Sequence, residues 1–122
     1  EREPDVMLDS PTSVQTAALY RLNGDRNPLH IDPEFARAAG LDAPILHGLA
    51  SYAIVCKAII DELLGGDTAR VRAYAVRFAG MLAPGETIRT RVWRDGSTLR
   101  LQASCPERNG APVLTHAEMD VR

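Results

Sequence analysis

The chain has 122 residues, which suits one domain and is long enough to bury a substantial core. A formal net charge of −2 gives no long-range attraction toward nucleic acid or anionic lipid, so we expect no nucleic-acid and no membrane partner. We find no apolar run of about eighteen residues that could span a membrane, no secretory signal, and two cysteines without metal-ligand spacing; these features predict a cytoplasmic protein that binds no metal.

The chain begins with a polar, proline-containing stretch that we expect to be an extended lead-in over residues 1–11. Thr12-Ser13 then offers a helix N-cap, and apolar residues follow at helical spacing. Asn23-Gly24 is a stop signal, so the pattern predicts a helix over 13–22.

Residues 23–47 are irregular, because glycines and prolines interrupt them repeatedly. One short helix is expected inside this segment. Asp32 can cap it, Pro33 suits its first position, and Gly40 suits the position just beyond its end. A loop of this length in a small domain is commonly functional.

Residues 49–64 predict a long helix that Gly65-Gly66 ends. Up to Ile60 only Ser51 and Lys57 are clearly polar. A helix that is apolar nearly all round is expected to be buried on most of its sides.

Beyond residue 69 the hydrophobic pattern alternates with a period of two, which is typical of strands with one solvated face. The expected inward sets are Val71, Ala73 and Ala75; Ile88, Thr90 and Val92; Leu99, Leu101, Ala103 and Cys105; and Val113, Thr115, Ala117, Met119 and Val121. Turn signals stand at Pro84-Gly85, Asp95-Gly96 and Asn109-Gly110, so the pattern predicts an antiparallel meander. A sheet of this kind wrapped around the long central helix is an α+β layout, of which the hot-dog fold is the best-known form. We expect one such domain over 1–122.

A carboxylate and an imidazole lie five residues apart in the loop, at Asp25 and His30. Pro28 stiffens the segment between them by fixing its own φ and restricting Asn27. An imidazole exchanges protons near neutral pH, and a neighbouring carboxylate can orient it or share a water with it. The pair is therefore either catalytic, or structural, with Asp25 capping a turn and His30 packing beneath the loop.

A second segment, residues 44–50 (PILHGLA), leads into the start of the long helix. Free backbone N–H groups and the positive end of the helix dipole gather there, and Gly48 allows a ligand to approach the backbone closely. A carbonyl oxygen placed at this point would have its developing negative charge stabilised. A tight turn into the helix is the alternative. His47 is interpreted as structural, and His116 as an ordinary residue on a strand face.

Residues 20–33 (YRLNGDRNPLHIDP) closely resemble the hydratase-2 signature of the MaoC-like dehydratase family. The likeness continues through Phe35-Ala36, Ala39-Gly40, 44–49 (PILHGL), 76–79 (VRFA) and 84–88 (PGETI). It covers nearly the whole chain and is weakest before residue 12. The Asp-x-Asn-Pro-Leu-His run followed by Leu-His-Gly is its most specific part.

This resemblance implies the reversible, (R)-specific hydration of a trans-2-enoyl-CoA to an (R)-3-hydroxyacyl-CoA. Asp25 and His30 match the catalytic pair that activates one water. Gly48 matches the glycine whose N–H polarises the thioester carbonyl, and Asn27 matches an asparagine that holds the loop or touches the substrate. The resemblance implies no metal and no redox cofactor, since CoA is part of the substrate.

Family members of the hydratase-2 type are double hot-dogs of about twice this length, with the motif in the second half, and this chain resembles that half. A lone hot-dog also leaves a broad sheet edge exposed. The chain is therefore expected to form a homodimer, to pair with a separate hot-dog chain, or to be one segment of a longer polypeptide. Its lead-in and its non-methionine start favour the last of these.

Two other functions compete with the hydratase interpretation. A hot-dog acyl-CoA thioesterase would cleave the thioester with a carboxylate and water, but the Asp-x-Asn-Pro-Leu-His run is typical of hydratases. A non-catalytic subunit that binds an acyl thioester would be expected to have lost Asp25 or His30, and both are present. The residues do not distinguish between acyl groups, between CoA and an acyl-carrier protein, or between hydration and dehydration.

Overall fold

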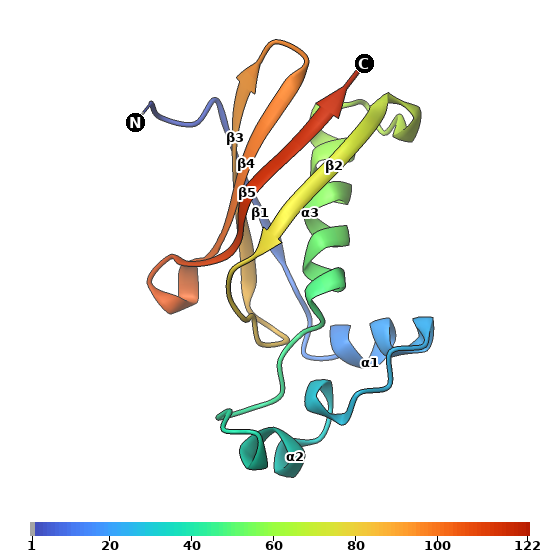
Figure 1. Cartoon of the computed structure of the whole chain (residues 1–122), viewed down its shortest axis with the longest axis vertical. Coiled ribbons are helices and arrows are strands. Elements are labelled where there is room, and N and C mark those ends of the chain that lie inside the picture. Colours follow the sequence, from blue (N-terminus) through green and yellow to red (C-terminus); the bar gives the residue numbers. More distant parts are fainter. Residues whose placement is uncertain (1) are drawn as a thin grey trace.

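A five-stranded antiparallel sheet packs against one long helix in the computed structural model, which describes residues 2–122 (Figure 1). The strands and helices are β1 (Val6–Pro11), α1 (Thr16–Tyr20), α2 (Pro33–Ala38), α3 (Gly48–Leu63), β2 (Val71–Phe78), β3 (Thr87–Asp95), β4 (Thr98–Cys105) and β5 (Ala111–Val121). The sheet curves around α3, so the predicted hot-dog layout is confirmed. Within the described residues no helix is both long and apolar enough to cross a membrane.

The strand order is β1-β3-β4-β5-β2. Strands β3, β4 and β5 form the predicted meander, and the left-handed residues Gly96, Asn109 and Gly110 occupy its two turns. The expected hairpin at Pro84-Gly85 is wrong, because β2 pairs with β5 at the far edge and residues 79–86 cross over to β3. A turn signal predicts a local reversal of the chain and leaves open which strands pair afterwards.

Residues 6–11, within the segment predicted to be extended, form an edge strand that the sequence pattern does not predict. β1 runs antiparallel to β3, with Val6 opposite Val92 and Ser10 opposite Ile88. Val6 and Leu8 are partly buried against the core, whereas Met7 and Asp9 point to solvent. The strand is only six residues long and half polar, so its pattern is too short to distinguish it from an extended loop.

The inward face of β2 differs from the predicted one. Ala73 and Ala75 are exposed, whereas Tyr74 and Val76 pack against the core, because the register with β5 shifts between Val71 and Ala73. A bulge of this kind moves the following side chains to the opposite face. His116 on β5 has φ +47 and is exposed, so it lies at an irregular point of the ladder rather than on an ordinary strand face.

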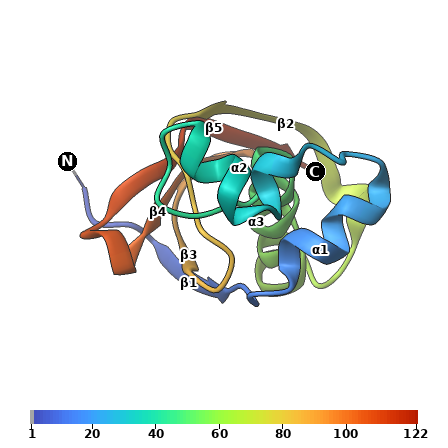
Figure 2. The same cartoon turned by 90° about the horizontal axis from the view of Figure 1, so that it is seen from below.

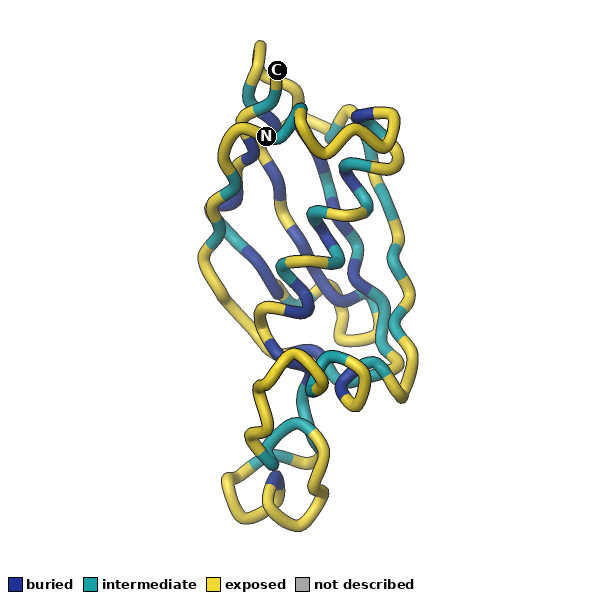
Figure 3. Tube along the Cα trace, turned by 90° about the vertical axis from the view of Figure 1, so that its right-hand side faces the viewer, coloured by how far each residue is buried: buried dark blue, intermediate teal, exposed yellow. Residues whose placement is uncertain are grey.

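Helix α3 buries only the side that faces the sheet. Ser51, Val55 and Ile59 recur every four residues along that side and join the core or lie within it. On the opposite side Ala53 is exposed and Leu49 keeps 57% of its surface accessible. Figure 3 shows buried and exposed stretches alternating along the helix. The expected burial on most sides is therefore wrong for this chain, because a single sheet covers one side of a helix.

Residues 12–47 lie across the end of the sheet where α3 begins, with α1 and α2 in front of α3 when seen from below (Figure 2). The predicted helix over 13–22 is confirmed as α1 followed by a 3-10 turn, Arg21–Asn23. The predicted short helix is confirmed as α2, and its Asp32 cap accepts hydrogen bonds from the N–H groups of Glu34 and Phe35. Glycine at position 40 has φ +89, as the helix end requires.

Candidate active site

The loop from Asp25 to His30 is held by its own side chains. The Asp25 carboxylate accepts from the N–H of Asn27 at 3.2 Å, and the Asn27 side-chain oxygen accepts from the N–H of Leu29 at 3.0 Å. Pro28 opens the 3-10 turn that ends at His30. These hydrogen bonds fix the backbone between the two candidate catalytic residues, and Asn27 therefore holds the loop; its contact with a substrate stays a prediction.

The His30 ring is oriented by a main-chain carbonyl. Its Nδ1 lies 2.8 Å from the carbonyl oxygen of Ile45, which can only accept a hydrogen bond. Nδ1 therefore carries the proton, and Nε2 is the nitrogen left for proton exchange. The side chain is half-buried, so its outer edge can meet a substrate.

A second imidazole, that of His47, lies directly against His30. The two rings stack with centroids 3.8 Å apart and planes 26° apart. The Tyr20 ring also contacts the His47 ring, at a centroid distance of 4.7 Å. His47 is only 2% exposed, and its Nε2 donates to the main-chain oxygen of Asp25 at 3.3 Å. Burial lowers the pKa of His47, against the opposing effect of the Asp25 hydrogen bond.

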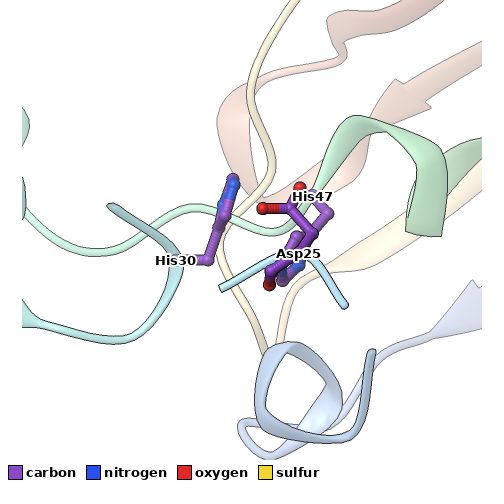
Figure 4. Close-up of side chains that lie close together, drawn as sticks. All are labelled: Asp25, His30 and His47. Carbon is purple, nitrogen blue, oxygen red and sulfur yellow. The ribbon is translucent and has the colours of Figure 1, made fainter. Parts of the chain in front are cut away.

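Asp25, His30 and His47 bring one side-chain oxygen or nitrogen each to within 4.8 Å of one another (Figure 4). The sequence predicts Asp25 and His30 as members of this cluster and indicates only a structural role for His47. Its position beside Gly48, in the segment leading into α3, was the one available signal. A carboxylate and two imidazoles can act as proton-transfer groups or as metal ligands, and the match of Asp25 and His30 to the predicted catalytic pair favours proton transfer.

Gly48 is the first residue of α3, directly after His47. Its N–H has no carbonyl four residues earlier within the helix to bond, so it is free for a ligand. A β-carbon at this position would lie 3.1 Å from Cδ1 of the Phe78 ring, so Phe78 and the Gly48 backbone are in close contact. A helix N-terminus beside an acid–base pair can stabilise negative charge that develops on a bound carbonyl.

Two hollows are lined by a residue of the cluster or by its neighbour Tyr20. One, of about 250 Å³, is lined by His30 together with apolar residues that include Ala17 and Pro44. Another, of about 290 Å³, is lined by Tyr20, Ala50 and Ala53 among others. The small residues Ala50 and Ala53 line this second hollow, whereas their neighbour Ser51 is buried.

The sheet wrapped on α3, with an Asp–His pair beside the first turn of that helix, defines a hot-dog domain with a candidate acid–base site. The chain belongs to the MaoC-like domain family, whose model matches residues 1–110. The predicted family is therefore confirmed.

Curated relatives carry hydratase names. The chain is 52% identical over 119 residues to enoyl-CoA hydratase ChsH3 of Mycobacterium tuberculosis, covering 98% of this chain and 42% of that protein. It is 43% identical over 119 residues to the peroxisomal enoyl-CoA hydratase 2 of Arabidopsis thaliana, covering 98% of this chain and 38% of the plant protein. The chain thus spans less than half the length of these relatives.

A solved structure reproduces the fold closely. The MaoC-like dehydratase from Phytophthora capsici superposes with a TM-score of 0.95 at 41% identity, covering all of this chain and 41% of that one. The (R)-hydratase of A. caviae, at 24% identity and a TM-score of 0.76, shares the fold over all of this chain and 96% of its own.

Proposed function

We propose that this chain is the catalytic hot-dog domain of an (R)-specific enoyl-CoA hydratase. The observation that carries the proposal is the convergence of Asp25 and His30 beside the first turn of α3, where Gly48 offers a free N–H. Relatives named enoyl-CoA hydratase support the same reaction.

The chemistry needs proton transfer and stabilisation of an enolate. Asp25 and Nε2 of His30 hold one water, whose oxygen bonds to C3 of the enoyl thioester while one of its O–H bonds breaks. A proton passes through the pair to C2, so one molecule of water is added across the double bond. The N–H of Gly48 stabilises the negative charge on the thioester oxygen during the reaction. No further cofactor takes part, and the reverse sequence dehydrates the (R)-3-hydroxyacyl-CoA.

The domain is proposed to work with a second hot-dog half. β2 is an edge strand of eight residues, Phe78 at its end is 53% exposed, and the outer side of α3 is partly apolar. An edge and an apolar surface of this kind are usually covered. The partner is a second copy of the chain, a separate hot-dog chain, or another part of a longer polypeptide.

A cytoplasmic location stays a proposal. Both cysteines, Cys56 and Cys105, are free, as expected for a reducing compartment. Some relatives have peroxisomal names, so the peroxisome is the alternative location. Microscopy of the tagged protein distinguishes the two compartments.

The test follows the loss of enoyl absorbance when the purified chain meets crotonyl-CoA, with the product resolved on a chiral column. We expect (R)-3-hydroxybutyryl-CoA, and Asp25→Asn or His30→Ala should each lower kcat by about 10³-fold. His116→Asn, an exposed histidine on β5, is the matched control and should leave the rate unchanged.

Parallel detection of free thiol separates the competing functions. Thiol release without hydration would favour a thioesterase. Binding of crotonyl-CoA without turnover, even with an added partner half, would favour a non-catalytic subunit. Full activity in both Asp25→Asn and His30→Ala would contradict the mechanism.

A further inference from the structure

We infer that His47 is a positioning residue, a neutral imidazole that holds the His30 ring and the Asp25 main chain in a fixed relation. This positioning role rests on the proposed hydratase activity, whereas the contacts and the protonation state of His47 are properties of the chain itself.

His47 contacts both members of the catalytic pair through different parts of its ring. Its face stacks on His30 at a centroid distance of 3.8 Å, and its Nε2–H donates to the Asp25 main-chain oxygen at 3.3 Å. His30 is also held at its Nδ1 by Ile45, so ring stacking supplies the second constraint that fixes its plane. The His47 side chain, just before α3, therefore contacts both Asp25 and His30, which lie five positions apart in the loop.

The surroundings of His47 favour its neutral form. The charged or titratable groups that face it are Asp25 on the loop, His30 on the 3-10 turn, Arg21 on the turn after α1, and the Tyr20 ring. Asp25 favours a proton on His47, whereas His30, Arg21 and burial disfavour it, and burial is the largest effect. A protonated His47 would also place its charge against the His30 ring, which must itself accept a proton during turnover.

The hydrogen bonding specifies one tautomer. Nε2 must carry the proton because the Asp25 carbonyl oxygen can only accept. Nδ1 is buried and has no hydrogen-bond partner among the described residues, so a proton there would lack an acceptor. His47 is therefore expected to remain in the neutral Nε2–H form while His30 gains and loses its proton.

The first test reads the protonation state without using activity. The chain has three histidines, and His116→Asn removes the exposed one, so two-bond ¹H–¹⁵N imidazole spectra between pH 5.5 and 8 contain only His30 and His47. We expect His47 as the neutral Nε2–H tautomer at neutral pH, with its titration displaced below the ordinary value of 6.5. The Nδ1–H tautomer, or titration near the ordinary value of 6.5, would overturn the inference even if the chain proved inactive.

The second test separates the two contacts. His47→Phe keeps a ring against His30 and loses the donor to Asp25, whereas His47→Ala loses both. We expect kcat to fall about tenfold in the first and about 10²-fold in the second, with KM changing by less than about threefold. The Hε1 resonance of His30 should lose its ring-current shift only in His47→Ala.

Circular dichroism and the melting temperature report whether each variant folds. A folded His47→Ala with wild-type kcat would overturn the inference, and so would an unchanged His30 resonance. Loss of stability with kcat retained would assign His47 a purely structural role. If neither the wild type nor the variants hydrate crotonyl-CoA, the proposed function fails separately, and the His30 resonance still decides whether His47 holds that ring.

Discussion

At the scale of single residues, the pKa of His47 makes folding depend on pH. The pKa is lowered from 6.5 by burial, so below pH 6.5 the unfolded chain binds more protons at this site than the folded chain. The free energy of unfolding should therefore fall as the pH falls through 6.5, and this contribution should level off below the folded pKa.

Thermal melts at pH 7.5 and 5.5 measure the effect. His47→Phe removes the titrating group and should show a smaller loss of melting temperature on acidification than the wild type. His116→Asn, which removes an exposed imidazole instead, should behave like the wild type. An equal loss in His47→Phe would mean that other groups cause the pH dependence.

Gly48 offers a second prediction at this scale. Gly48→Ala places a methyl group 3.1 Å from the Phe78 ring, on a backbone that we propose a thioester contacts. Phe78 is half-exposed and can move, and alanine favours a helix, so the melting temperature should stay within about 3 °C of wild type. We expect kcat/KM for crotonyl-CoA to fall by at least about tenfold.

The double variant Gly48→Ala/Phe78→Ala distinguishes the two causes. Recovery of activity would assign the loss to displacement of Phe78. Continued loss would assign it to the methyl group blocking the approach to the Gly48 N–H. Wild-type activity in Gly48→Ala itself would contradict a close contact between substrate and this backbone.

At the scale of elements, two tyrosines fasten α3 to the edge strand β2. The Tyr52 hydroxyl donates to the Tyr74 carbonyl and the Tyr74 hydroxyl donates to the Tyr52 carbonyl, both at 3.0 Å, while the rings stack 4.2 Å apart. Burial raises the pKa of Tyr74, so its hydroxyl stays protonated and able to donate. These reciprocal contacts hold β2 against α3, although β2 is an edge strand and pairs only with β5.

Removing either hydroxyl should loosen this junction. We expect Tyr52→Phe and Tyr74→Phe each to destabilise the fold by about 1 kcal/mol, which lowers the melting temperature by roughly 4 °C. In the double variant the losses should not add, because the two reciprocal hydrogen bonds join the same pair of residues. Unchanged melting temperatures in both single variants would show that the pair does not hold β2 in place.

At the scale of the whole molecule, the uncovered side of α3 and the β2 edge predict association. If the chain pairs with itself, its mass in solution should be twice 13.3 kDa, and Phe78→Asp on β2 should shift it toward the monomer. Met7→Asp, an exposed apolar residue on the opposite edge strand, is the matched control and should leave the mass unchanged. Light scattering after size-exclusion chromatography measures the mass in solution of the wild type and both variants.

A monomeric and inactive chain that gains activity with an added hot-dog half would identify a different partner. A mass of 13.3 kDa with full activity would contradict all three proposed arrangements. In that case the domain would be active while the outer side of α3 stays exposed to solvent.

The sequence alone determined the elements that depend on neighbours along the chain. The long helix follows from its apolar run, α2 from its Asp32 cap, and the candidate pair from the spacing of Asp25 and His30 on a proline-stiffened loop. Caps, periodicity and turn signals act over a few residues, so they can be recognised from the sequence without knowledge of the fold. The motif resemblance added the family, which the comparisons confirmed.

Only the tertiary structure decided how these elements meet. The pairing of β1 with β3, the position of β2 beside β5 and the bulge that turns Tyr74 inward all depend on residues more than thirty positions apart. The same is true on a smaller scale of His47, whose stacking on His30 arises where the loop folds back onto the start of α3. Long-range contacts of this kind come from the competition between alternative strand pairings and packings, which no local pattern in the chain encodes.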